Sequence, residues 1–230
     1  ILDVRAGLGY TGVVLEDGAC GLAYTFRNEL GFGCGILNDA GNLVGSNAAE
    51  LLPWLMDSNR LKAAIGLAAV NAVINSQPGE NWGTGDVVDE LEVEESDTFG
   101  MVGDFKPILM KVREKTKDIY VFEKNPPLGS DLFPSETIPV HLTKCSVVIV
   151  TATSIINHTI DEVLPYCQNA RVVCMVGAST PLCPEVFKDF NVTLLAGSLV
   201  QDPSKAMETI SQGGGVKALK PVIRQVLVQV

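Results

Sequence analysis

The sequence predicts an α/β protein in which a Rossmann-like parallel-sheet domain is preceded by a small α+β domain. Before residue 95, β-rich runs come first and apolar helical segments follow them. After residue 95, short runs of Val, Ile and Leu alternate with helical segments, which is typical of parallel strands covered on both faces. We therefore expect two domains, residues 1–95 and 96–230.

The N-terminal domain is predicted from a hairpin followed by helices. Two β-rich runs flank a short turn sequence that contains Gly18, which is the pattern of a β-hairpin. Ser46 has the chemistry of an N-cap for the first helix, and the second helix is rich in Ala. The predicted strands are residues 2–5, 11–16 and 21–26, and the predicted helices are residues 48–56 and 61–74.

The C-terminal domain is predicted as a series of βα units. The expected strands are residues 98–102, 119–123, 146–151, 171–176 and 192–196. The expected helices between them are residues 106–115, 135–144, 159–167 and 184–189. A last apolar segment, from residue 216 to about residue 228, is expected to be a C-terminal helix that packs across either domain. Open parallel sheets of this kind bind ligands outside the carboxyl ends of their strands.

Composition limits the class of protein. With 47% hydrophobic residues, a chain of 230 residues can bury a substantial core. The longest apolar stretch, residues 63–74, is well short of the roughly 20 residues that a membrane span needs. No signal peptide is recognisable, although the chain begins at Ile1 and not at Met. We expect a cytoplasmic protein that does not enter the membrane.

The charge argues against nucleic acid as a partner. The formal net charge is −10, whereas affinity for nucleic acid depends on cations that contact phosphates. Much of the acidity lies in residues 86–97, which hold seven carboxylates and no base. A run of like charges is typical of a solvated connector, which we favour here over a metal-binding cluster.

The cysteines favour a reducing compartment. The six cysteines form no C-x-x-C pair and show no zinc-finger spacing with histidine. Cys145, Cys167 and Cys174 lie in or beside apolar runs, and we expect them to be small core residues. A chain of this size does not need disulfides to be stable.

The first predicted βα unit carries a partial nucleotide-binding pattern. Gly100 and Gly103 lie at the end of the first strand, but the full G-x-G-x-x-G is absent and Asp104 would repel a phosphate there. Glu123 ends the next strand, 20 residues after Gly103, at the spacing where Rossmann domains place a ribose-binding carboxylate. The alternatives are a tight turn at Gly103 and an ordinary exposed carboxylate at Glu123.

Two polar clusters follow the central predicted strands. Thr151, Thr153, Ser154 and Asn157 come after one strand, and Gly177, Ser179 and Thr180 come after the next. Because the carboxyl ends of parallel strands share one edge of the sheet, we expect both clusters to converge on a polar ligand or an oxyanion. Such residues also cap helices, so that role stays open for Asn157.

Two further side chains are candidates for the same site. His158 lies within the expected ligand-binding edge and could act as an acid, a base or a metal ligand. Arg27 follows the second strand of the N-terminal domain and could reach a ligand carboxylate or phosphate across the cleft. The alternative for Arg27 is a surface ion pair.

Taken together, these stretches resemble the family described as "putative heavy-metal chelation". The resemblance covers nearly the whole chain. It rests on G-V-V-L and A-Y-T-F-R, the helix A-I-G-L-A-A-V-N-A, M-V-G-D-F-K-P, V-F-E-K-N-P, T-A-T-S-I-I-N, V-G-A-S-T-P-L, L-A-G-S and G-G-G. The resemblance implies an N-terminal domain similar to that of enolase, a Rossmann-like domain, a site between them and a role with heavy metals or their chelates. Ala152 and His158 stand where glycines are usual in the family, which would narrow the pocket or add a ligand.

Three functions follow as hypotheses. The leading one is a protein that binds a small anionic or nucleotide-like ligand between its domains, with a metal chelate or its precursor as that ligand. The alternative is a Rossmann-type transferase or oxidoreductase that uses an adenosyl cofactor, with Glu123 on the ribose. The third is direct binding of a divalent heavy metal through His158, Cys174 or Cys183 with acidic groups. The apolar composition is also compatible with a homodimer.

Overall fold

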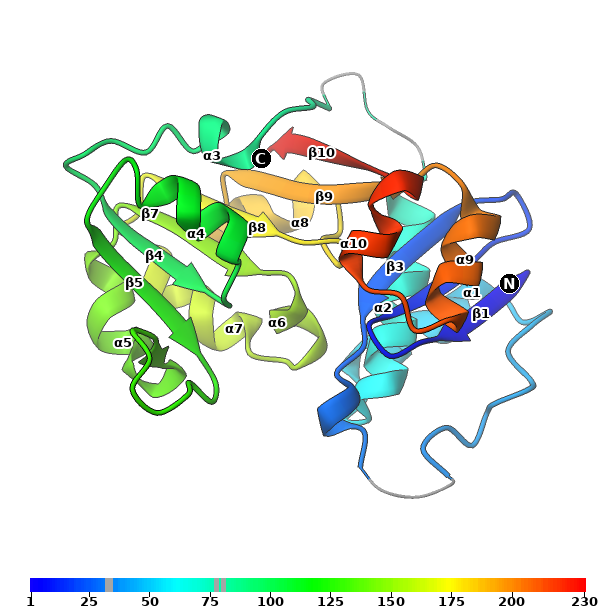
Figure 1. Cartoon of the computed structure of the whole chain (residues 1–230). Coiled ribbons are helices and arrows are strands. Elements are labelled where there is room, and N and C mark those ends of the chain that lie inside the picture. The colour runs from blue at the N-terminus through cyan, green and yellow to red at the C-terminus, as the bar shows by residue number, and fades with distance from the viewer. Residues whose placement is uncertain (32–34, 77–78, 80–81) are drawn as a thin grey trace.

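The computed structural model describes residues 1–31, 35–76, 79 and 82–230. The chain forms an N-terminal α+β lobe and a larger Rossmann-like lobe, and the C-terminal segment runs between the two (Figure 1). No helix among the described residues has the length and apolar character to cross a membrane.

The N-terminal lobe contains a three-stranded antiparallel sheet. Its order is β1 (Asp3–Ala6), β2 (Tyr10–Val14) and β3 (Cys20–Tyr24). The apolar helix α2 (Arg60–Ile74) packs against one face of this sheet. Gly21 permits the close approach, because a Cβ there would collide with the backbone of α2 at Ala68 and Ala72.

The first predicted helix of this lobe differs from expectation. Residues 48–56 form a short helix α1 (Ala48–Leu51) and then a 3-10 segment, Leu52–Met56, with Pro53 in its first turn. The N-cap is Asn47, whose side chain accepts a 2.9 Å hydrogen bond from the amide of Ala49. Ser46 is not the cap, because its hydroxyl donates to the carbonyl of Leu43.

The larger lobe contains a seven-stranded sheet in the order β10-β9-β8-β7-β4-β5-β6. Its first six strands are β4 (Thr98–Val102), β5 (Asp118–Glu123), β6 (Phe133–Pro134), β7 (Val147–Thr151), β8 (Val172–Val176) and β9 (Leu194–Val200). These strands pair in parallel, and β10 (Ile223–Gln229) pairs antiparallel with β9. Numbered from β4, the order of the parallel strands is 3-2-1-4-5-6, which is the Rossmann order.

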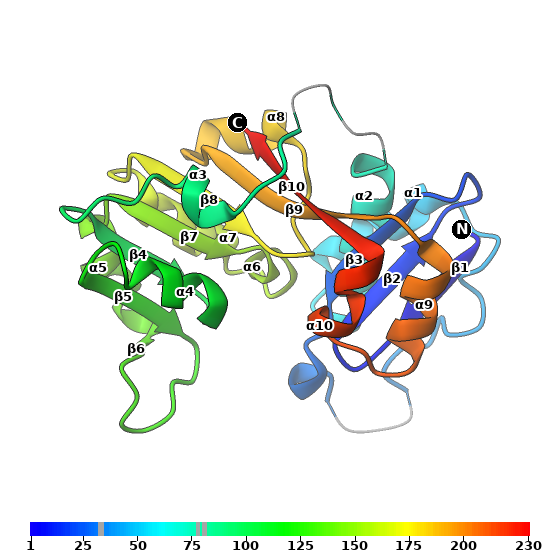
Figure 2. The ribbon, with the colours of Figure 1, turned by 45° about the horizontal axis from the view of Figure 1, so that its top comes forward.

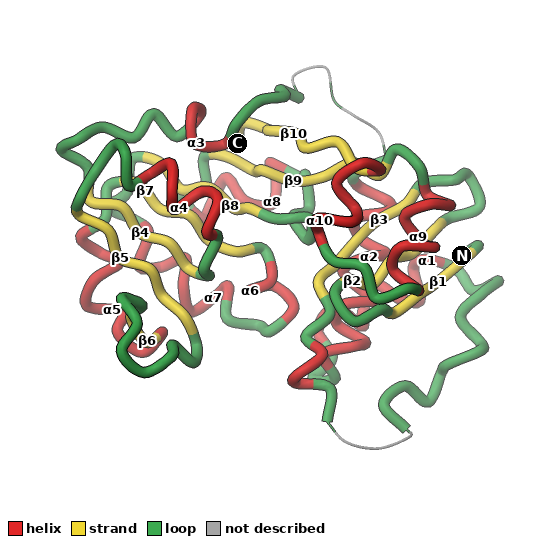
Figure 3. The backbone as a smooth tube through the Cα atoms, in the orientation of Figure 1, coloured by secondary structure: helices red, strands yellow, loops and turns green. Residues whose placement is uncertain are grey.

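Helices cover both faces of this sheet, as Figure 3 shows. One apolar layer joins the sheet to α3 (Val87–Glu90) and α4 (Lys106–Val112). The opposite layer joins it to α5 (Ile138–His141), α7 (Ile160–Val163) and α8 (Pro184–Phe187). The continuous Val and Ile runs of β7 and β8 are buried for this reason.

The predicted C-terminal helix is wrong for most of its length. Residues 216–228 form only one helical turn, α10 (Val216–Leu219), a 3-10 turn and then β10. The 3-10 turn includes Pro221, which lacks an amide proton, and the following residues pair with β9. Figure 2 shows β10 running beside β9 along the edge of the large sheet.

The C-terminal segment also packs against the N-terminal lobe. Helix α9 (Pro203–Ser211) places Ala206, Met207 and Ile210 against β2 and β3, on the face of the small sheet opposite α2 (Figure 1). The division of the sequence into domains of residues 1–95 and 96–230 stays a proposal. In space, residues 203–223 belong to the apolar core of the N-terminal lobe.

The acidic run is only partly solvated. Asp86 caps α3 through the amide of Val88, whereas Asp97 at the other end is buried and receives a 2.6 Å hydrogen bond from Arg171. Cys145, Cys167 and Cys174 are buried core residues as expected.

Candidate functional site

A cavity of about 960 Å³ lies between the lobes. Its walls include residues at the carboxyl ends of β4, β5 and β7, together with the segment that follows β3 in the N-terminal lobe. The strand order reverses between β4 and β7, and Rossmann-type sheets bind ligands at such a switch point. The volume falls in the range of small-molecule sites.

The turn after β4 forms one wall and joins the end of β5. Gly103 has a φ of +95°, which an L side chain rarely adopts. The backbone amide of Asp104 then donates a 2.7 Å hydrogen bond to Oε1 of Glu123. Both Gly103 and Glu123 line the cavity, and their role in ligand binding stays a prediction.

The segment after β7 forms a second wall. Thr151, Thr153 and Asn157 line the cavity, and the hydroxyls of the two threonines lie 2.9 Å apart. Oδ1 of Asn157 accepts hydrogen bonds from the amide and hydroxyl of Thr159, which is the N-cap residue of α7, so the side chain of Asn157 orders the turn before this helix and does not itself cap it. Ser154 does not line the cavity, because it is buried and donates to the carbonyl of Thr151.

The N-terminal lobe supplies the third wall. The cavity is lined here by Tyr24, Phe26, Arg27 and Glu29. The rings of Tyr24 and Phe26 pack edge to face, with their centroids 5.1 Å apart. Glu29 forms an ion pair of 3.1 Å with Lys124, which follows β5 in the other lobe. Arg27 lies at this cleft between the lobes, and its contact with a ligand stays a prediction.

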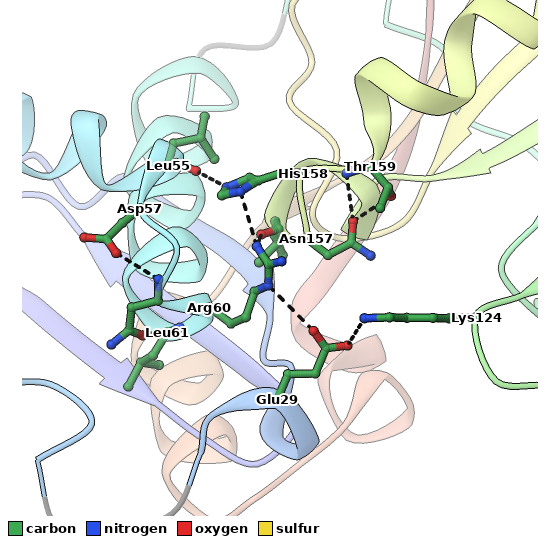
Figure 4. Close-up of polar contacts among 11 residues, drawn as sticks. Glu29, Leu55, Asp57, Arg60, Leu61, Lys124, Asn157, His158 and Thr159 are labelled. Atoms are coloured by element: carbon green, nitrogen blue, oxygen red, sulfur yellow. Dashed lines mark hydrogen bonds and ion pairs between the residues drawn. The ribbon is translucent and has the colours of Figure 1, made fainter. Parts of the chain in front are cut away.

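Figure 4 shows how His158 is held between the lobes. Its Nε2 lies 2.9 Å from the carbonyl oxygen of Leu55, and its Nδ1 lies 3.3 Å from Nη1 of Arg60. Both ring nitrogens therefore have protein partners, and His158 is absent from the cavity lining. The role of His158 as a metal ligand stays a prediction, although in this structure its ring contacts Leu55 and Arg60 of the other lobe and not the cavity.

The resemblance led us to expect a glycine at position 158, and the backbone conformation there is one that glycine adopts readily. His158 has a φ of +61°, in the left-handed region that favours glycine. Ala152 has an ordinary φ of −65° and is buried beneath the turn. Neither substitution adds a side chain to the cavity.

The second predicted polar cluster has a different role. Gly177, Ser179 and Thr180 do not line the cavity, so the two clusters do not converge as predicted. Ser179 and Thr180 are 1% and 0% exposed, and they join the lobes by hydrogen bonds. Oγ of Ser179 accepts from the amide of Tyr24, and the carbonyl of Thr180 accepts from Nδ2 of Asn75.

The predicted cysteine ligands are not placed for metal binding. Cys174 is fully buried in the sheet, and burial raises the pKa of its thiol far above the ordinary range. Cys183 is half-buried, and its thiol donates a 3.5 Å hydrogen bond to Oε2 of Glu185. No group of three or more His, Cys, Asp or Glu side chains with metal-binding geometry occurs in the described part of the chain.

Several cavity residues were missed at the sequence level. The carboxylates that line the cavity are Glu29, Asp104, Glu123, Glu136, Asp161 and Glu162. The bases that line it are Arg27 and Lys124. The E-K-N-P segment after β5 was a usable signal for Lys124 and Asn125, since it directly follows Glu123. Asp161, Glu162 and Tyr166 come from α7 and the turn after it, and no local pattern marks them.

The fold and the cavity define a two-lobed α/β protein whose Rossmann-like sheet has a candidate small-ligand site at its topological switch point. Two family models match the chain, over residues 1–74 and 86–229, and both carry the description "putative heavy-metal chelation". The chain belongs to this family.

Relatives of the chain support the same assignment. An uncharacterised protein of Methanocaldococcus jannaschii is 30% identical over 215 residues, which are 90% of this chain and 81% of that protein. Two crystal structures of family members of unknown function cover 100% of this chain and 92% of their own chains. The Desulfitobacterium hafniense protein is 22% identical with a TM-score of 0.87, and the Pyrococcus horikoshii protein is 25% identical with a TM-score of 0.85.

Proposed function

We propose that this chain binds a metal chelate, or the precursor of one, in the cavity between its lobes. The observation that supports this most is the cavity itself, which has about 960 Å³ of space at the switch point of the sheet and walls from both lobes. This volume is on the order of that needed by a whole organic ligand and exceeds by far the roughly 30 Å³ that one water occupies. The family description supplies the link to metals.

The chemistry of the walls suits a chelate that carries both polar and apolar groups. Thr153 and Asn157 offer hydroxyl and amide groups, and Glu123 offers a carboxylate that is already oriented by the amide of Asp104. Phe26 and Tyr24 offer apolar ring surface on the opposite side. Pockets for small molecules combine these features, with a few polar groups that fix the orientation of the ligand.

A second candidate function is a transferase or oxidoreductase that uses an adenosyl cofactor. One observation favours it: Glu123 ends the second strand of the Rossmann sheet and is fixed to the turn after the first strand by the Asp104 amide. In Rossmann domains the carboxylate that accepts hydrogen bonds from the ribose hydroxyls lies at this position.

We also propose that the protein is located in the cytoplasm, because buried free thiols such as Cys145 and Cys167 suit a reducing compartment.

Calorimetry and thermal shift with the purified chain test the two candidates. The probes are divalent metals, the same metals with small chelators, and adenosyl compounds, since a ligand that binds only the folded state raises the melting temperature. A shift with metal chelates that Thr153→Trp abolishes supports the first candidate. A shift with an adenosyl compound that Glu123→Ala abolishes supports the second. Metal binding that survives Thr153→Trp lies outside the cavity and would contradict the first.

A further inference from the structure

The lining of the inter-domain cavity has an excess of negative charge. Six carboxylates and two basic residues line it. One of the two bases, Lys124, is already paired with Glu29 at 3.1 Å, and Glu29 also lies 3.6 Å from Nε of Arg60. Among the described residues, Asp104 and Glu123 form no ion pair with any base.

Asp104 carries an acceptor that the protein leaves without a partner. Its Oδ1 is buried, yet no described residue donates a hydrogen bond to it. A buried carboxylate oxygen without a donor costs free energy, so a ligand that brings a donor or a cation to this point is favoured. The backbone amide of the same residue orients Glu123, which places two carboxylate residues at the same corner of the cavity.

Aromatic rings stand in the same lining as these carboxylates. Tyr24, Phe26, Phe105 and Tyr166 line the cavity. Ring faces attract cations through their quadrupole, and the attraction grows when water is excluded. A positively charged organic group interacts favourably with both carboxylates and ring faces, so this lining suits such a group.

The turn after β4 disfavours a polyphosphate at the position where Rossmann cofactors place one. A Cβ on Gly103 would lie only 3.1 Å from Cβ of Thr151, so the turn packs tightly against the end of β7. Asp104 follows directly, where a phosphate-binding turn would offer backbone amides and no carboxylate. A phosphate group placed here would meet like charge.

From these observations we propose that the cavity selects a small ligand with a net positive charge, held beside Asp104 and Glu123. This inference rests on the proposed function and adds the charge class of the ligand. Two kinds of ligand have such a positive charge: a cationic metal complex, and an organic sulfonium or ammonium compound. Anionic chelates and nucleoside polyphosphates are excluded by the same charges.

Two matched pairs of probes separate charge from shape. Hexaamminecobalt(III) is a cationic complex and cobalt(III)–EDTA is an anionic one, and both exchange ligands so slowly that no free metal complicates the titration. S-adenosylmethionine and S-adenosylhomocysteine share a framework and differ by the methyl group and the positive charge at sulfur. We expect calorimetry to detect at least one cationic probe and to give at least ten-fold weaker binding for its partner.

Charge-removing variants locate the effect. Asp104→Asn and Glu123→Gln keep the shape of the side chains, and each is expected to weaken the cationic probe about ten-fold, as removal of one nearby charge predicts. Glu50→Gln is the matched control, because it changes the net charge of the protein equally at an exposed site outside the cavity.

The possible results have distinct meanings. Binding of cationic probes that Asp104→Asn weakens and Glu50→Gln does not supports the inference. Equal or stronger binding of the anionic or neutral partner, abolished by Thr153→Trp, would overturn the charge preference and keep the proposed function. Cationic binding that all three cavity variants leave unchanged would place the charge effect outside the cavity and overturn the inference. If none of the four probes binds, the inference fails, whereas the proposed function fails only if the divalent-metal chelates of its own test do not bind either.

Discussion

The backbone amide of Asp104 donates a 2.7 Å hydrogen bond to Oε1 of Glu123, which joins the turn after β4 to the end of β5. Glu123→Ala removes this acceptor and should lower the free energy of unfolding by about 1 kcal/mol. Glu123→Gln keeps an acceptor oxygen at the same point, so it should cost less than about 0.5 kcal/mol. Urea denaturation of both variants measures the difference. Equal losses for Ala and Gln would show that the hydrogen bond does not stabilise the turn.

The ion pair between the buried Asp97 and the partly exposed Arg171 makes stability depend on pH. Burial by itself raises the pKa of Asp97, but hydrogen bonds from Arg171, Ser146 and the Glu94 amide outweigh it and hold this pKa below its ordinary value. Because the pKa is lowered in the folded state, the stabilisation is present above the unfolded value of about 3.9 and is lost as the pH falls through the folded one.

The matching variant is Asp97→Asn. At pH 7 it should lower the free energy of unfolding by about 2 kcal/mol, since it weakens charged hydrogen bonds to a largely buried group. Denaturation at pH 7, 5, 4 and 3 should show a constant difference from the wild type down to about pH 5 and a shrinking one below about pH 4. A difference that stays the same at pH 3 would contradict the assignment.

Two variants of His158 separate the stabilisation by its side-chain contacts from the cost of its backbone strain. With a φ of +61°, it occupies a conformation that glycine adopts without strain, while its ring joins Leu55 and Arg60. His158→Ala loses the contacts and keeps the strain, whereas His158→Gly loses the contacts and relieves it. We expect the Gly variant to be more stable than the Ala variant by about 1 kcal/mol in thermal unfolding. The reverse order would show that the turn is not under backbone strain.

Much of the fold could be predicted because burial on both faces leaves a direct pattern in the sequence. The apolar runs of β7 and β8 were found within one residue at each end for this reason. The end of the chain could not be predicted in the same way. Apolar residues at 222, 223 and 226–228 fit a buried helix or a buried strand equally well, and the choice depends on pairing with β9, far from any local signal.

The site was predictable where it follows from the strand ends. Gly103, Glu123 and Thr151 were found because each follows or ends a strand at the switch point. Ser179 and Thr180 follow a strand too, but β3 and the end of α2 in the other lobe lie there and take up their hydrogen bonds. Sequence position could not show which strand end the N-terminal lobe covers.

Asn75 tests this buried contact between the lobes. Its Nδ2 donates to the carbonyl of Thr180 and its Oδ1 accepts from the amide of Leu182. Asn75→Ala leaves both backbone groups buried without partners and should lower the free energy of unfolding by about 2–4 kcal/mol. Ser76→Ala is the control, since Ser76 is exposed and its hydroxyl donates to the carbonyl of Val73 at the end of the same helix. Similar stability for the two variants would mean that water replaces the lost bonds.

The thiols offer a chemical test of the packing. Burial raises the pKa of Cys20, Cys145 and Cys167 to about 12, so at pH 8 only about one such thiol in ten thousand is ionised. Cys183 is half-buried beside Glu185, and burial followed by this carboxylate raises its pKa less. In a Cys34→Ser variant, which removes the cysteine outside the described residues, iodoacetamide at pH 8 should therefore label Cys183 first.

Mass spectrometry of peptides from the labelled protein measures the rates one cysteine at a time. The buried thiols should react at least ten-fold more slowly than Cys183 in the native protein, and all should react at similar rates in urea, where burial no longer raises their pKa. Labelling of Cys174 as fast as Cys183 under native conditions would require the sheet to open at β8. That result would contradict the buried position of Cys174 and would reopen its role as a ligand.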